Sequence, residues 1–151
     1  ITIGTPTATT SGTSIDLTGI PAGTKRFTLS FNGISTNGSS HIVVQLGDSG
    51  GIETTGYVGR VTHGTVSSAN STSLKVTDVN GATLIWYGGA VFTKIDSSSH
   101  TWLMRGTLSP NSTVNISDGI KTLTGELTQL RLTTVGGTDT FDAGAINIIY
   151  G

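Results

Sequence analysis

The sequence predicts an all-β domain, an antiparallel β-sandwich with a jelly-roll-like arrangement. Three observations predict it. Gly, Ser and Thr make up 67 of the 151 residues, and Thr is joined by many Val and Ile, a composition that favours strands and turns over helices. Short segments alternate between apolar and polar residues, as half-buried strands do. Turn residues separate these segments about every 8–12 residues, the spacing typical of sandwiches and barrels.

The clearest alternation runs over residues 26–34. The side chains that we expect on its buried face are Phe27, Leu29 and Phe31. Residues 41–46 repeat the pattern, and Asn37-Gly38 lies between the two segments. Because Asn-Gly supplies the positive φ of a tight turn, the sequence predicts a hairpin that joins these two strands.

Further strands follow along the chain, separated by turn residues such as Asn80-Gly81 and Asp118-Gly119. We expect them at residues 54–63, 73–78, 82–87, 91–96, 100–108, 113–116, 121–123, 130–134 and 145–150. No segment has a convincing helical period, and no repeat of fixed length occurs. Residues 1–13 are expected to form a linker or an edge strand, and residues 14–151 a single sandwich domain.

Charge and composition exclude several classes of function. The formal net charge is -1, so the chain lacks the basic surface with which proteins bind nucleic acid or anionic membranes. No apolar run approaches the roughly 18 residues of a membrane span. Cys is absent, which excludes disulfides and thiolate chemistry. The chain begins with Ile1 rather than Met, so we expect it to be a piece of a longer protein.

Two pairs of carboxylates are the first candidates for catalysis. Asp48 and Glu53 flank a Gly-rich turn, and Asp139 and Asp142 flank Thr140-Phe141. A glycosidase holds two carboxyl groups about 5–9.5 Å apart. Asp residues in Gly-rich loops more often cap turns, and we therefore predict capping for both pairs and no catalytic residues.

The three histidines are isolated in the sequence. His41, His63 and His100 show no metal-binding spacing, so no metal site or cofactor is predicted, although ligands from separate strands could meet in space. We expect the histidines to lie at solvent-facing strand ends or at contacts on a threefold axis. A phosphate-binding loop and a nucleophile elbow are both absent from the sequence.

Aromatic side chains suggest sugar binding, because neutral sugars stack on aromatic rings. Trp86 and Tyr87 are adjacent in a strand, so one faces the core and the other faces solvent. We expect Trp86 and Trp102 to fill the core. Tyr57, Arg60 and Tyr87 are the better candidates for a binding surface.

Three stretches together resemble a known family. Residues 19–57 (GIPAGTKRFTLSFNGISTNGSSHIVVQLGDSGGIETTGY), 100–110 (HTWLMRGTLSP) and 121–151 (KTLTGELTQLRLTTVGGTDTFDAGAINIIYG) resemble, in this order, the C-terminal domain of bacteriophage and prophage tail fibres, tailspikes and related receptor-binding proteins. The resemblance implies a non-enzymatic tip module of a homotrimeric fibre in the virion tail. Any depolymerase activity would belong to an upstream domain.

The resemblance implies binding of bacterial surface polysaccharide or lipopolysaccharide. It does not identify the individual residues that would bind the sugar. From residue type alone we expect the glycan to contact Asp48, Glu53, Tyr57, Arg60, His63 and Tyr87. Ile149 lies on the opposite strand face from Ile146 and Ile148, so we predict that it contacts a neighbouring subunit. A trimerisation cap without ligand is the alternative function, and a glycan hydrolase is a less favoured one.

Overall fold

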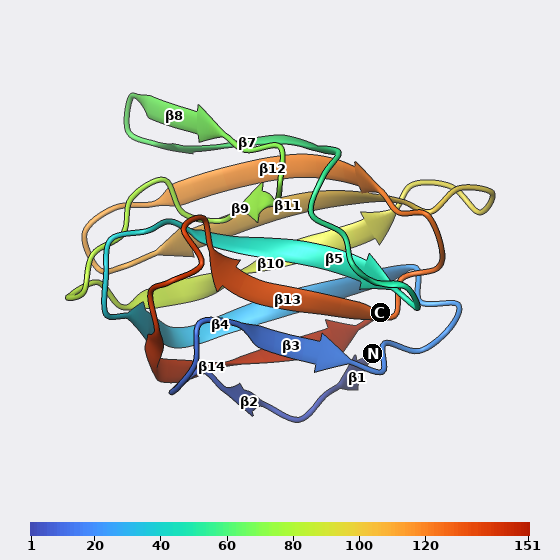
Figure 1. Cartoon of the computed structure of the whole chain (residues 1–151), viewed down its shortest axis with the longest axis horizontal. Coiled ribbons are helices and arrows are strands. Elements are labelled where there is room, and N and C mark those ends of the chain that lie inside the picture. Colours follow the sequence, from blue (N-terminus) through green and yellow to red (C-terminus); the bar gives the residue numbers. More distant parts are fainter.

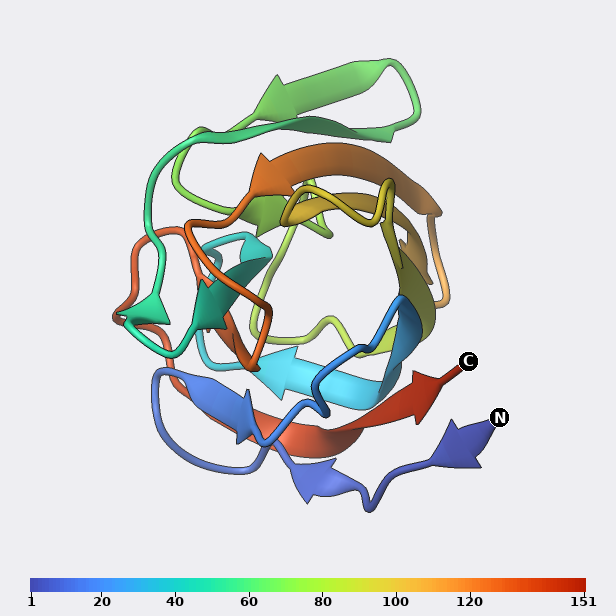
Figure 2. The same cartoon turned by 90° about the vertical axis from the view of Figure 1, so that its right-hand side faces the viewer.

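A computed structural model describes all residues, 1–151, and contains only strands, turns and loops. Fourteen strands form two antiparallel sheets that pack face to face (Figure 1), which confirms the predicted all-β sandwich. No helix is long and apolar enough to cross a membrane. Seen along the long axis, the larger sheet curls around the core and the smaller sheet closes the remaining side (Figure 2).

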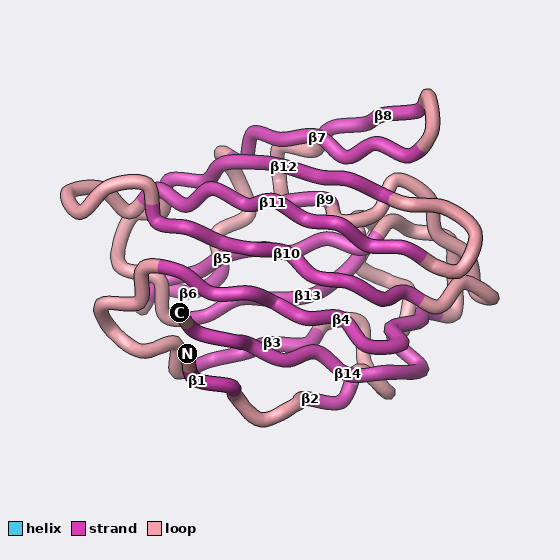
Figure 3. Tube along the Cα trace, turned by 180° about the vertical axis from the view of Figure 1, so that it is seen from behind, coloured by secondary structure: helices cyan, strands magenta, loops and turns pink.

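The larger sheet, called sheet A, has nine strands and makes up the side of the molecule that faces the viewer in Figure 3. Its order is β1 (Thr2–Ile3), β14 (Phe141–Tyr150), β4 (Arg26–Thr36), β10 (Trp86–Lys94), β11 (Thr101–Ser109), β12 (Asn115–Thr122), β7 (Tyr57–His63) and β8 (Val66–Ala69), with β2 (Thr7–Ala8) also paired to β14. The first thirteen residues thus supply edge strands to sheet A.

The smaller sheet, sheet B, has five strands. Its order is β3 (Ile15–Thr18), β13 (Gln129–Thr134), β5 (Ile42–Asp48) and β6 (Gly51–Ile52), with β9 (Leu74–Lys75) also paired to β5. The central strand β5 is buried along almost its whole length. Both faces of β5 are therefore covered, one of them by the core between the two sheets.

The core lies between the two sheets and depends on a few large rings. Phe27 and Phe92 stack with ring centroids 4.7 Å apart, and Trp102 lies tilted against Phe27 at 5.6 Å. Trp86 is fully buried and its Nε1 donates a hydrogen bond to Oδ1 of Asn80, so its polar atom is satisfied inside the core. Burial of Phe27, Leu29, Phe31 and both tryptophans confirms the predicted alternation.

The predicted hairpin between residues 26–34 and 41–46 is wrong. The two strands form, but β4 belongs to sheet A and pairs with β10 and β14, whereas β5 belongs to sheet B and pairs with β13. The segment around Asn37-Gly38 carries the chain from one sheet to the other. Both strands bury a face in the same core, and this burial determines their partners more strongly than the turn sequence does.

Two predicted pairs of short strands are single long strands. Residues 82–87 and 91–96 contribute to one strand, β10, which continues through Gly88 and Gly89. Residues 113–116 and 121–123 likewise contribute to β12, which continues through Asp118-Gly119. Gly119 is extended and lies opposite Gly59 of β7. Glycine at this position therefore allows the two strands to approach closely and does not form a turn.

Candidate functional site

A shallow groove lies on the outer face of sheet A. It extends over β11, β12 and β7 and is bordered by β8, which lies at the top of the molecule in Figures 1 and 2. Two adjoining hollows of about 730 and 710 Å³ share Arg60 and Asp118, so they form one continuous groove.

Local sequence explains how the strands beneath the groove fit together. Gly59 and Gly119 are cross-strand partners in β7 and β12. A Cβ on Gly59 would lie 2.4 Å from the carbonyl oxygen of Asp118, and a Cβ on Gly119 would lie 2.5 Å from Cδ2 of Leu74. The two glycines therefore allow the strands to approach closely and allow Leu74 to pack on their inner side.

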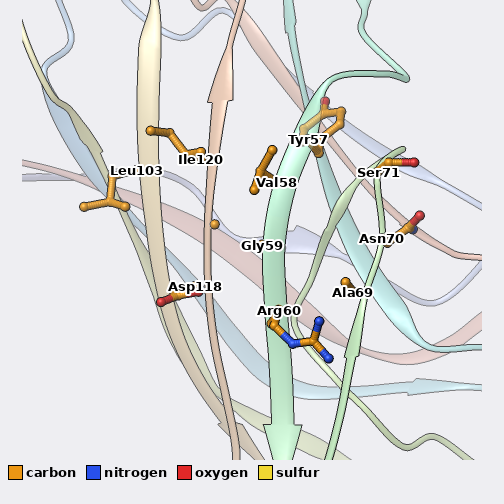
Figure 4. A pocket seen from close by; sticks show the side chains of 11 residues that line it. Tyr57, Val58, Gly59, Arg60, Ala69, Asn70, Ser71, Leu103, Asp118 and Ile120 are labelled. Carbon is orange, nitrogen blue, oxygen red and sulfur yellow. The ribbon is translucent and has the colours of Figure 1, made fainter.

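Aliphatic side chains cover much of the groove. Val58, Leu103 and Ile120 come from three adjacent strands and meet at one end of it (Figure 4). Val58 is 67% exposed, and Ile116, farther along β12, is 57% exposed. These residues alternate with inward-facing core residues, so the strand period itself places them on the outer face.

A row of charges crosses the same groove. Arg60, Asp118 and Arg105 are directly paired in register across β7, β12 and β11. Neighbouring strands of this kind hold side chains within reach of one another. None of the three makes an ion pair: Arg60 donates to Oγ of Ser67 on β8 at 3.0 Å, and its side chain points away from that of Asp118 (Figure 4). The row is exposed and open to a ligand.

Three of the predicted glycan-binding residues belong to a cluster that links the two sheets. Lys121 Nζ donates to Oε1 of Glu53 at 2.8 Å and lies 5.0 Å from the ring centroid of Tyr57. Thr124 Oγ1 lies 2.6 Å from Oδ2 of Asp48 and 3.0 Å from Oε2 of Glu53, so one hydroxyl proton serves two carboxylates. The cluster joins β5 and the loop after β6 to β7, β12 and the segment after β12.

The prediction that Tyr57 is a surface residue is wrong. Its side chain is almost fully buried, with 3% of the residue exposed, because Tyr57 shares the inward face of β7 with Val61. Its hydroxyl accepts from the amide of Leu46 at 2.8 Å and donates to the carbonyl of Glu53 at 2.7 Å. Burial raises the pKa of Tyr57 to about 12. The ring is a structural support and offers no face to a sugar.

Both carboxylates of the cluster are held in the ionised form. The hydrogen bond from the Thr124 hydroxyl, aided by the Gly50 amide, lowers the pKa of Asp48. Burial acts to raise the pKa of Glu53, but the hydrogen bond from Lys121 and those from Thr124 outweigh it, and the pKa is lowered. Asp48 also caps its own turn, since its Oδ1 accepts from the Gly50 amide at 2.8 Å.

The remaining predicted contacts are scattered. His63 lies at the end of β7, with Nδ1 3.5 Å from Oδ2 of the buried Asp78, and its side chain is 25% exposed. Tyr87 is 53% exposed on β10, opposite Asn32 of β4, which confirms that it faces solvent while Trp86 faces the core. Of the six predicted residues, Arg60 and Tyr57 line the groove, and of these two only Arg60 is exposed.

The other sequence candidates lie outside the groove. Asp139 accepts a hydrogen bond from the Ser40 amide at 2.9 Å, and Asp142 is exposed. No group of three or more His, Cys, Asp or Glu side chains is placed to hold a metal ion. Ile149 is half-buried on the outer face of sheet A, where its cross-strand partners are Ile3 and Thr28. Ile146 and Ile148 face the core, as the alternation predicts.

Sequence reasoning missed Asp118 as a groove residue because the pair Asp118-Gly119 was interpreted as a turn. The signal was present in the alternation of Ile116, Asp118 and Ile120, which all face outward once β12 is recognised as one strand. Arg105 becomes notable only through its register with Asp118, which depends on which strands pair.

No family model, no curated protein and no solved structure matches this chain.

Proposed function

We propose that this chain is the tip module of a bacteriophage tail fibre or tailspike, a homotrimer in the virion tail that binds bacterial surface polysaccharide or lipopolysaccharide. Two independent arguments support the proposal. Three ordered stretches of sequence resemble the C-terminal domain of such proteins. The fold is also a strand-rich sandwich whose large outer sheet offers a ready binding surface.

The observation on which glycan binding depends is the open charge row in the groove. Arg60, Asp118 and Arg105 keep most of their hydrogen-bonding capacity, because none of them is in an ion pair. Guanidinium and carboxylate groups make charge-assisted hydrogen bonds, and their planar shape suits pairs of neighbouring hydroxyl groups. The aliphatic floor formed by Val58 and Ile120 provides contact for the C–H face of a sugar ring.

Individual sites of this kind bind weakly, because the groove is open and lacks an exposed aromatic ring. Three copies on one rigid tip would raise the overall affinity without any further contact, since each later binding event becomes intramolecular. The proposed homotrimer and the proposed glycan site therefore support each other functionally.

The lowered pKa of both Asp48 and Glu53 supports a non-enzymatic function. Glycoside hydrolysis requires one carboxyl group that remains protonated and acts as a general acid. In this pair the Lys121 and Thr124 hydrogen bonds favour the ionised form of both groups. The tight network around the carboxylates also occupies the space that a scissile bond would need.

Binding can be tested on an array of bacterial surface glycans with the wild-type chain and two matched variants. Arg60→Gln removes a charge from the groove, and Arg131→Gln removes one from sheet B. We expect discrete array signals that fall about tenfold in Arg60→Gln, since hydrogen bonds to charged groups contribute about 1.5–3 kcal/mol, and that persist in Arg131→Gln. Equal losses in both variants would contradict the groove assignment.

A trimerisation cap without ligand is the second candidate, and a specific observation favours it. Ile3 is 70% exposed beside Ile149 at the β1–β14 edge, far along sheet A from the groove, and apolar residues of this kind suit an obligate interface. Light scattering should report a trimer for the wild type and monomers or insoluble chains for Ile149→Asp. An unchanged trimer in the variant would contradict this interface, and a trimer with a blank glycan array would favour the cap.

A further inference from the structure

A second cluster of charge lies away from the groove, at the ends of β4 and β10. Lys25 immediately precedes β4 and Lys94 ends the adjacent strand β10, and the amide of Lys94 donates to the carbonyl of Lys25 at 2.8 Å. Both residues line a hollow of about 230 Å³ with Thr24 and Ser97. A neighbouring hollow of about 590 Å³ is also lined by Lys25 and adds Arg26. We call Lys25, Arg26 and Lys94 the basic corner.

The basic corner stands out because its cations lack side-chain partners. The chain has eight Lys and Arg residues. Four of them donate hydrogen bonds to side chains, namely Arg60, Lys75, Lys121 and Arg131. Of the remaining four, three are in the corner, and there the only side-chain hydrogen bond is a long one, 3.5 Å, from Arg26 to the carbonyl of Gly151.

No acid forms an ion pair with the basic corner. Asp96 lines the smaller hollow with the two lysines, yet it makes no ion pair with either of them. Its carboxylate instead accepts four hydrogen bonds from Ser98 and Ser99, which form a tight turn around it. Glu126, whose Oε1 accepts from the Gly23 amide at 2.8 Å, likewise makes no ion pair with the corner. Like charges on adjacent strands destabilise a sheet, and no ion pair within the chain offsets the repulsion in the corner.

We infer that the basic corner binds an oxyanion, a phosphate or a carboxylate group carried by a larger ligand. Lysine ammonium groups bind such groups as point charges, and the smaller hollow is large enough to hold a phosphate between Lys25 and Lys94. The hydroxyl of Ser97 beside them is a further possible donor. This site is separate from the groove and does not depend on the proposed function.

The test is a titration of the ¹⁵N-labelled chain, followed by NMR, with inorganic phosphate, glucuronate and glucose in turn. We expect saturable shifts of the amides of residues 23–26 and 94–97 with phosphate or glucuronate and none with glucose. A tighter response to phosphate assigns the site to phosphorylated ligands, and a tighter response to glucuronate assigns it to acidic sugars.

Two variants that each remove one positive charge test whether the effect is specific to the corner. Lys94→Gln should lower the affinity for the oxyanion about fivefold, the usual effect of losing one exposed charge contact. Arg131→Gln on sheet B should leave this affinity unchanged. The folded state of both variants is checked in the same NMR spectra. Absence of saturable shifts in the wild type, or an equal loss of affinity in both variants, would overturn the inference.

Discussion

Both sheets carry opposite charges at facing positions on neighbouring strands, but the charges form an ion pair in one sheet and none in the other. In sheet B, Arg131 of β13 faces Asp16 of β3 and closes on it, with Nε and Nη2 donating at 2.7 and 2.9 Å to the two carboxylate oxygens. In sheet A, Asp118 of β12 faces Arg60 on one side and Arg105 on the other, and neither pair closes.

Register alone does not make an ion pair. Arg60 has a competing partner, Ser67 on β8, so its guanidinium points away from Asp118. Arg131 has no such competitor and adopts the bidentate geometry that Arg and carboxylate prefer. Of these facing charges, the ones that stay unpaired lie in the groove.

The buried pair Lys121–Glu53 provides the largest contrast with these exposed charges. Replacing Lys121 by Met leaves Glu53 and Asp48 close together without a cation, and removing one partner of a buried pair costs about 3–5 kcal/mol. We expect the free energy of unfolding in urea to fall by about 3 kcal/mol, since Glu53 is only partly buried. The same change at Arg131 should cost less than about 1 kcal/mol; equal losses would remove the distinction.

Acid should weaken the same cluster. The pKa of Glu53 and that of Asp48 lie below their ordinary values of 4.5 and 3.8, so the unfolded chain takes up protons before the folded chain does. The stabilisation is fully present above about pH 5 and is lost as the pH falls through the folded-state values. Urea unfolding across pH 2–7 should show this fall in the wild type and a shallower one in Glu53→Gln; parallel curves would contradict it.

The smallest expected effects concern the open charge row in the groove and the closed Arg131–Asp16 pair. Asp16→Asn opens the bidentate pair and should cost about 0.5 kcal/mol, the usual contribution of an exposed ion pair. Asp118→Asn breaks no ion pair, so the free energy of unfolding should stay within about 0.5 kcal/mol of the wild type. Thermal unfolding of both variants at low salt measures the difference. A larger loss in Asp118→Asn would show that its row is structural.

Much of the fold could be predicted from the sequence because one-sided burial leaves a period of two. Phe27, Leu29 and Phe31 identify a strand and its inner face without reference to any partner. Strand pairing could not be predicted in the same way. Asn37-Gly38 favours a turn, yet the two flanking strands pair in different sheets and bury their apolar faces in the core between them.

The site was less accessible to prediction for the same physical reason. Residue type drew attention to Asp48, Glu53 and Tyr57, but polar side chains near a sheet junction are satisfied by one another and leave nothing for a ligand. Asp118 and Arg105 are unremarkable in the sequence. Their importance comes from cross-strand register, which is a property of the assembled sheet.

The most direct test of the groove compares glycan affinity in Asp118→Asn and Asp16→Asn, using the strongest ligand found on the array. Each variant removes one exposed carboxylate charge, from the open row and from the closed pair respectively. The account predicts a loss of at least about tenfold for Asp118→Asn and wild-type affinity for Asp16→Asn. Wild-type affinity in Asp118→Asn would contradict the claim that the open row binds the ligand.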